Sequence, residues 1–119
     1  MVRAVTSHEA AVVSWLLDHA AMCDVIAYRQ RPVEDLRVVG GCDCGCFSLD
    51  FAPCGFGGAG IIADGLAVYS DGQMDDLILW GQAGEITSLE VVKYDPRTPH
   101  RSPQLSDLRT WEEHGQAQP

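Results

Sequence analysis

Hydrophobic positions near the N-terminus recur at the spacing of a helix. From residue 6 to about residue 21, the apolar stripe consists of Val13, Leu16, Leu17 and Ala20, with polar residues on the opposite face. Thr6 and Glu9 form a capping box, in which each side chain accepts a hydrogen bond from the other residue's backbone N–H. A second helix is predicted over about residues 22–30. It ends before Pro32, because a proline ring interrupts the hydrogen-bond ladder.

Beyond residue 33 the hydrophobic period changes from helical to alternating. A short strand is predicted over residues 36–39, and Phe47, Leu49 and Phe51 then alternate with more polar residues, as in a strand with one buried face. Further strands are expected over residues 61–69, 77–80 and 85–94, joined by glycine-containing turns. In the last strand Ile86 and Leu89 are out of phase, so an inward orientation of both predicts a β-bulge near residues 87–88.

These elements predict an α+β fold, with one or two N-terminal helices packed on one face of an antiparallel meander of four to five strands. The core is expected to join two sets of apolar residues: Phe47, Leu49, Phe51, Leu77, Leu79, Leu89 and Val91 from the sheet, and Val13, Leu16, Leu17 and Ala20 from the first helix. The 119 residues fit a single domain. Residues from about 96 to 119 are rich in proline and polar side chains, and we expect them to form a partly loose C-terminal tail.

The chain is strongly acidic. Its 17 Asp and Glu residues outnumber its 8 Lys and Arg residues, and the net charge is -9 with neutral histidines. Such a surface repels phosphate backbones and anionic membranes, so we expect no nucleic-acid or membrane binding and instead a basic partner. No run reaches the roughly 18 apolar residues of a membrane span, and the N-terminus lacks a signal-peptide pattern. We therefore expect a cytoplasmic protein, and the sequence leaves open whether it forms homo-oligomers.

Three of the five cysteines lie within five residues of one another. Together with a fourth thiol they supply candidate ligands for a tetrahedral zinc ion: Cys42, Cys44, Cys46 and Cys54, with His100 or His114 as alternative fourth ligands. In an extended C-x-C the Cα atoms lie about 6.5–7 Å apart, so one ion could be shared only if the chain bends at Gly45. Packing of small, soft side chains at a glycine-rich bend is the simpler interpretation. A redox role is disfavoured because the neighbouring Asp43 and Asp50 raise the thiol pKa.

Motifs for catalysis are missing from the chain, and no catalytic or cofactor-binding residue is predicted. There is no nucleophile elbow, zinc-protease motif or catalytic-cysteine signature. The glycine-rich segment 55–60 lacks the lysine and hydroxyl residue of a phosphate loop, so a connecting loop is the better interpretation. For Trp80, at a strand end, core packing is favoured over a role as an exposed contact residue.

Two groups of carboxylates are candidate sites. The first is Asp71, Asp75 and Asp76, which lack the spacing of a calcium-binding loop and are interpreted as a solvated turn with a charged strand start. The second is Asp64, Glu85 and Glu90, of which two could meet across neighbouring strands and act as an acid–base pair.

Two motifs occur together in this chain: Cys42-x-Cys44-Gly45-Cys46 before an alternating strand, and Gly84-x-Ile86-x-x-Leu89-Glu90-Val91. Over about residues 36–94 the chain resembles a group of short bacterial proteins, mostly from actinomycete-type genomes, whose function is unknown. Such proteins often carry proline after the Cys-Gly-Cys, where this chain has Phe47. The resemblance implies a compact α+β domain and transfers no activity or catalytic residue.

Three functions are compatible with these patterns. The favoured one is a small non-enzymatic protein-binding module, of the immunity or inhibitor type, that acts on a basic partner. The second is a zinc-binding domain that uses the cysteines between residues 42 and 54. The third is a small hydrolase or isomerase with carboxylates near Asp64 and Asp71, which predicts a polar pocket containing a carboxyl group of raised pKa.

Overall fold

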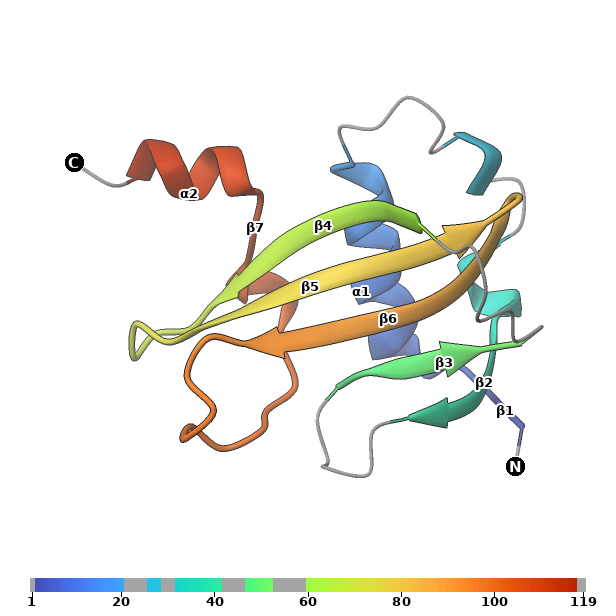
Figure 1. The fold of residues 1–119 in the computed structure, drawn as a ribbon, viewed down its shortest axis with the longest axis horizontal. Coiled ribbons are helices and arrows are strands. Elements are labelled where there is room, and N and C mark those ends of the chain that lie inside the picture. Colours follow the sequence, from blue (N-terminus) through green and yellow to red (C-terminus); the bar gives the residue numbers. More distant parts are fainter. Residues whose placement is uncertain (1, 21–25, 29–31, 42–46, 53–59, 118–119) are drawn as a thin grey trace.

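The computed structural model describes residues 2–20, 26–28, 32–41, 47–52 and 60–117 (Figure 1). In this part of the chain the protein has an α+β fold, in which one main helix packs on an antiparallel sheet of seven strands. The predicted α+β class with an antiparallel sheet is therefore confirmed, but the sheet is larger than the four to five strands expected. It is also not the simple meander that was predicted, because β3 pairs with β6 and not with β4. Of the second predicted helix only residues 26–28 are described, and they form a single helical turn.

The sheet has the strand order β1-β2-β3-β6-β5-β4-β7. Its strands are β1 (Arg3–Ala4), β2 (Arg37–Gly41), β3 (Leu49–Phe51), β4 (Gly60–Val68), β5 (Met74–Gln82), β6 (Glu85–Lys93) and β7 (Leu108–Arg109). The helices are α1 (Ser7–Asp18) and α2 (Trp111–Ala117), and the short 3-10 turns are η2 (Val33–Asp35) and η3 (Leu105–Asp107). None of the described helices is long and apolar enough to cross a membrane.

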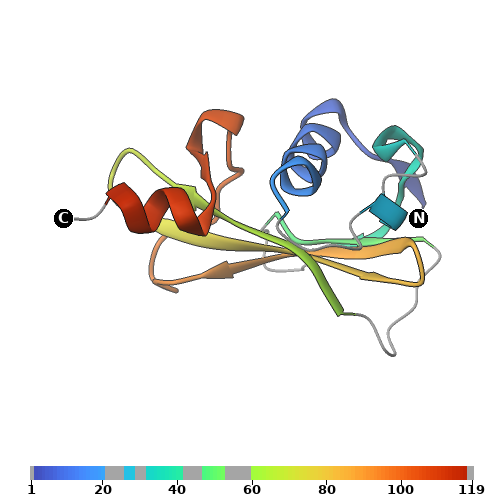
Figure 2. The same cartoon turned by 90° about the horizontal axis from the view of Figure 1, so that it is seen from above.

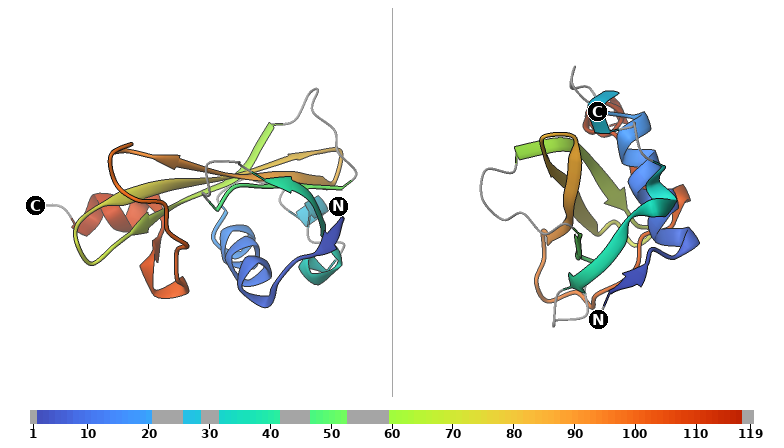
Figure 3. Two further views of the ribbon diagram at one scale, coloured as in Figure 1. Left: turned by 90° about the horizontal axis from the view of Figure 1, so that it is seen from below. Right: turned by 90° about the vertical axis from the view of Figure 1, so that its right-hand side faces the viewer.

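The helical elements are distributed unevenly over the sheet. Seen from above, α1, η2 and η3 lie on one side of the sheet, and α2 lies beside the β4 end of the strand order (Figure 2). The two views in Figure 3 show the same arrangement from below and from the side. The sheet therefore has one face covered by α1 and another face that none of the described helices covers at β5 and β6.

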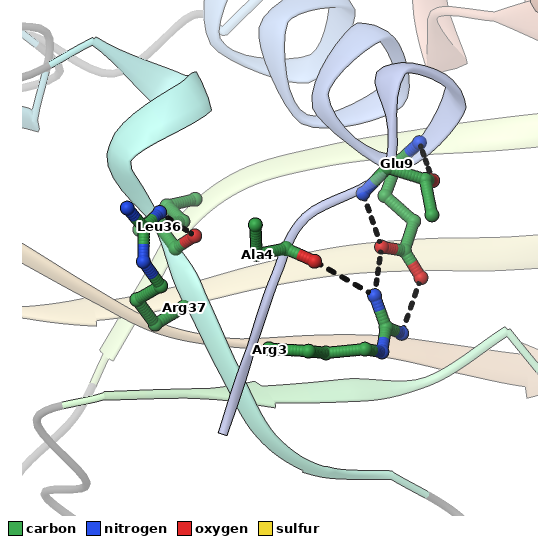
Figure 4. A network of polar contacts seen from close by, with 6 residues as sticks. Arg3, Ala4, Glu9, Leu36 and Arg37 are labelled. Carbon is green, nitrogen blue, oxygen red and sulfur yellow. Dashed lines mark hydrogen bonds and ion pairs between the residues drawn. The ribbon is translucent and has the colours of Figure 1, made fainter.

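The start of α1 is fixed by the capping box that the sequence predicts. The Thr6 hydroxyl accepts a hydrogen bond from the Glu9 N–H at 3.1 Å, and the Glu9 carboxylate accepts one from the Thr6 N–H at 2.9 Å. The Arg3 guanidinium of β1 donates two further bonds of 2.8 Å to this carboxylate (Figure 4). These bonds lower the pKa of Glu9 despite its burial, and they join the edge strand to the helix.

The predicted core is confirmed. Its buried members include eight of the expected residues: Val13, Leu16, Leu17, Leu49, Phe51, Leu77, Leu79 and Leu89. Ala20, Phe47 and Val91 are partly buried and pack against this cluster. The predicted β-bulge is also present, because the β5–β6 register shifts between the pairs Trp80–Ser88 and Gly81–Ile86, which leaves Thr87 as the extra residue.

The C-terminal region returns to the sheet through short elements. β7 pairs with β4 at Leu66 and Ala67, and Leu108 is buried in the core. On the preceding segment, the Arg101 guanidinium stacks 3.8 Å from the centre of the Tyr69 ring and pairs with Asp71 at 3.1 Å. These contacts hold residues 101–109 against the β4–β5 hairpin.

Gly81 of β5 lies too close to its neighbours for a larger side chain. A Cβ atom there would lie 2.6 Å from the Tyr28 ring and 3.0 Å from the backbone oxygen of Glu85. We expect Gly81→Ala to lower the free energy of unfolding by about 1–3 kcal/mol, because the ring and a strand must shift. Gly60→Ala is the control, since no heavy atom lies within 4 Å of the added methyl group. Urea denaturation of both variants tests this, and equal stabilities would contradict the close approach.

Candidate functional site

The face of the sheet opposite α1 carries a characteristic set of side chains. A Cβ atom at Gly65 would contact Trp15 and Leu16, so this position of β4 faces α1, and its neighbour Asp64 faces away. By register and alternation, the same face of the β4–β5–β6 meander contains Asp64 and the fully buried Leu66 of β4, Asp76, Ile78 and Trp80 of β5, and Ser88, Glu90 and Val92 of β6. We call this set the open face.

Three carboxylates lie on the open face, one on each strand of the meander. Asp64 and Glu90 are both paired in register with Ile78, from opposite sides of β5. Asp76 precedes Ile78 by two residues on the same face. The structure therefore brings Asp64 and Glu90 around Asp76, so that the central strand carries a carboxyl group between two others.

Asp76 is held in an environment that favours its neutral form. Burial, a side-chain hydrogen bond with Asp64 and the negative charges of Asp64 and Glu90 raise its pKa to about 7. Leu66, directly opposite Asp76 on β4, is fully buried, in agreement with the loss of solvent around this carboxyl group. The Oδ1 atom of Asp76 is itself buried and accepts no hydrogen bond from any described residue.

Two tryptophans bind the outer carboxylates. The indole N–H of Trp111, from α2, donates to Asp64 Oδ1 at 3.0 Å, and that of Trp80 donates to Glu90 Oε1 at 3.1 Å. Trp80 was expected in the core, but the alternation of β5 places it on the open face, so that prediction is wrong. The outer carboxylates each have a donor within the protein, whereas Asp76 Oδ1 has none among the described residues.

Large apolar side chains are exposed on and beside the open face. Val92 is 40% exposed, Trp111 is 43% exposed and Tyr94 is 51% exposed. Tyr94 follows β6, and burial together with the charges of Asp76 and Asp64 raises its pKa. The surface therefore combines aromatic and aliphatic groups with carboxylates.

The remaining predicted carboxylates lie elsewhere. Asp71 is in the turn before β5 and pairs with Arg101. Asp75 is buried on the α1 side of β5, where its carboxylate accepts a hydrogen bond of 3.0 Å from the Tyr69 hydroxyl. The predicted charged strand start is present, since Asp75 and Asp76 belong to the first residues of β5. The expected solvation is wrong for these two residues, because Asp75 is buried and the Oδ1 atom of Asp76 is buried as well.

A cleft of about 270 Å³ lies at another part of the molecule. Tyr28, Val33, Leu36, Glu85 and Ile86 are among its lining residues, and none of the lining residues belongs to the open face. A carboxylate-dependent hydrolase or isomerase, the third function considered from the sequence, requires a carboxyl group of raised pKa within a pocket. Among the described residues, the cleft and the shifted carboxyl group lie at different places.

The predicted zinc ligands Cys42, Cys44, Cys46 and Cys54 lie outside the described residues. Within the described part of the chain, no group of three or more histidine, cysteine or acidic residues is arranged to hold a metal ion. His100, proposed as an alternative ligand, is exposed, and His114 lies on α2. The zinc site stays a prediction.

Comparisons with protein-family models, curated proteins and solved structures found no significant match for this chain. The fold and the site define an α+β protein with one helix-covered sheet face and one acidic, aromatic-rich face. The functional argument therefore depends on the chemistry of the open face.

Proposed function

We propose that the protein is a small non-enzymatic binding module, which receives a basic protein partner through the open face. The observation that carries this proposal is the combination of three carboxylates on the open face with two exposed aromatic side chains beside it, Trp111 of α2 and Tyr94. Aromatic side chains dominate the binding energy of many protein interfaces. Carboxylates select a partner of opposite charge, and the net charge of -9 attracts such a partner from a distance.

An immunity or inhibitor protein is the type of module that fits these properties. Such a protein needs a rigid surface, and here the acidic and aromatic groups lie on paired strands. The five cysteines favour a cytoplasmic setting, because an odd number of thiols does not form a complete disulfide framework.

The proposal predicts that binding depends on the open-face carboxylates. We expect Asp64→Asn combined with Glu90→Gln to weaken binding of a captured basic protein by about tenfold or more. The amides keep an oxygen that can accept the indole hydrogen bonds, so only the charge changes. The matched control is Glu34→Gln combined with Asp35→Asn, because both residues are exposed on η2, on the α1 side of the sheet.

The experiment starts with affinity capture from a lysate of the source organism, followed by identification and purification of the captured protein. Its dissociation constant is then measured by calorimetry with the wild type, the open-face variant and the control variant. The proposal predicts a basic protein that the control variant binds within about twofold of the wild type. Equal affinity for the wild type and the open-face variant would contradict it.

One observation favours a carboxylate-dependent hydrolase or isomerase as a second candidate. Near neutral pH, the protonated Asp76 beside Asp64 has the arrangement of a general acid next to a base. The cleft among the described residues contains neither group, so we place this candidate second. The zinc-binding domain depends on the cysteines between residues 42 and 54, and metal analysis of protein purified without added zinc decides it.

A further inference from the structure

We infer that the cleft beside the β5–β6 turn is a second binding site, which takes a small amine with an apolar body about the size of one ring. The cleft lies apart from the open face, so the inference goes beyond the proposed function and does not depend on it.

Segments from four parts of the sequence meet at the cleft. They are the helical turn of residues 26–28, the segment 32–36 that contains η2, Ala52 after β3, and the turn between β5 and β6. The volume of about 270 Å³ is close to the lower end of the range of ligand sites, which is roughly 300–1,000 Å³. An apolar cavity of about 150 Å³ holds a benzene ring. The cleft therefore has room for one ring with a short substituent.

The lining of the cleft is largely apolar and includes an aromatic ring. The Tyr28 ring lies over Gly81 of β5, where an added Cβ atom would be 2.6 Å from its Cε1 atom. Tyr28, Val33 and Leu36 are partly buried and pack against the core, and Ile86 is buried in it. A flat apolar ligand can stack on the tyrosine ring or meet it edge to face.

The β5–β6 turn is fixed against the segment that carries Tyr28. Ala83 and Gly84 form a two-residue hairpin turn with φ values of 51° and 82°, between the paired residues Gln82 and Glu85. Turns of this kind favour asparagine or glycine at both central positions, so Ala83 is strained. A Cβ atom at Gly84 would lie 3.7 Å from the backbone oxygen of Ala27, an ordinary contact distance. Backbone strain of this kind is concentrated at functional sites such as ligand clamps.

Charge at the cleft selects a cation. Asp35 and Glu85 are among its lining residues, and none of the described lining residues is lysine, arginine or histidine. The neighbouring Arg37 is not a lining residue, and its guanidinium donates to two backbone oxygens. Both carboxylates attract a ligand that carries one positive charge, and the face of the Tyr28 ring attracts it as well. An ammonium group also supplies three N–H donors for these acceptors.

Benzylamine and benzyl alcohol are matched probes for this site, because they share one ring and differ in the charge of a single substituent. We expect benzylamine to bind the full chain at about pH 7 with a dissociation constant of about 1 mM or below. Benzyl alcohol should bind about fivefold more weakly, since hydrogen bonds with a charged group are the stronger ones. An NMR titration of isotope-labelled protein should show the largest shift changes at Tyr28, Val33, Gly84 and Ile86.

Two variants test the role of the carboxylates. Asp35→Asn combined with Glu85→Gln should weaken benzylamine binding about fivefold, to the level of benzyl alcohol, and should change benzyl alcohol binding by less than about twofold. Glu34→Gln is the matched control, because Glu34 is next to Asp35 on η2 and has the same charge but does not line the cleft. It should keep the preference for the amine.

Three results would overturn the inference. They are equal affinity of the wild type for the two probes, an amine preference that persists in the Asp35 and Glu85 double variant, and no saturable shifts up to about 10 mM benzylamine. Shift changes concentrated at the indole groups of Trp80 and Trp111 would also overturn it, because they would place the amine on the open face. The capture experiment is independent of these results, since the described lining residues of the cleft include none of the open face.

Discussion

Truncation of Phe51 to alanine should lower the free energy of unfolding by about 3–5 kcal/mol. Phe51 lies on β3, and its side chain is fully buried in the cluster that joins the sheet to α1. Removing the ring eliminates its contacts and leaves a cavity that the surrounding strands fill only in part. Since small domains are stable by about 5–15 kcal/mol, a large fraction of this variant should unfold under mild conditions.

Phe51→Leu is the matched control for this prediction. It keeps most of the apolar volume and should cost less than about 1.5 kcal/mol. Urea denaturation followed by circular dichroism measures both variants. Equal stability of Phe51→Ala and Phe51→Leu would contradict the placement of β3 in the core, which rests on the β2–β3 and β3–β6 pairings.

The second large effect is a pH-dependent stabilisation by Asp76→Asn. The folded protein raises the pKa of Asp76 from 3.8 to about 7, so it binds more protons than the unfolded chain between these values. The wild-type carboxyl group therefore adds to the free energy of unfolding. This contribution is fully present below about pH 4 and is lost as the pH rises to about 7. Asparagine is neutral throughout and can donate to Asp64, so it avoids this loss.

At about pH 8 we expect Asp76→Asn to be more stable than the wild type by about 1–2 kcal/mol, with no gain near pH 4. One pKa unit corresponds to about 1.4 kcal/mol, and screening of a partly exposed carboxyl group reduces the full value. Urea denaturation at several pH values measures the difference, with Glu34→Gln as the control. A variant less stable than the wild type at about pH 8 would mean that the fold favours the charged form of Asp76.

The main helix and the core were predictable because their signals are local. Thr6 and Glu9 form the capping box that starts α1, and the alternation around Leu49 and Phe51 marks β3. The bulge at Thr87 followed from the phase of two apolar residues. In each case a few neighbouring residues carry the whole pattern, so no long-range contact has to be known.

The additional strands could not be predicted in the same way. β1 and β7 have only two residues each, which is too short for an alternating pattern. They are strands because β2 and β4 offer free backbone groups beside them, and this depends on the tertiary fold. Counting strands from sequence periodicity therefore underestimates the number of strands in the sheet.

The open face was predictable in part. The sequence indicates that two of Asp64, Glu85 and Glu90 could meet across strands, but it predicts Asp76 only as part of a solvated turn with a charged strand start. Since β5 begins at Met74, alternation turns Asp75 towards the core and Asp76 away from it. The period-two series Asp76, Ile78 and Trp80 was the available signal. The burial of Asp76 depends on neighbouring strands, so the sequence alone did not indicate its raised pKa.

The central claim is that the open face is the surface that binds a basic partner. Amide and indole chemical shifts of isotope-labelled protein, recorded by NMR while a hexa-arginine peptide is added near pH 8, test this claim most directly. The account predicts the largest changes at Asp64, Asp76 and Glu90 and at the indole N–H groups of Trp80 and Trp111. Changes concentrated on α1 and η2, with both indole signals unmoved, would contradict it.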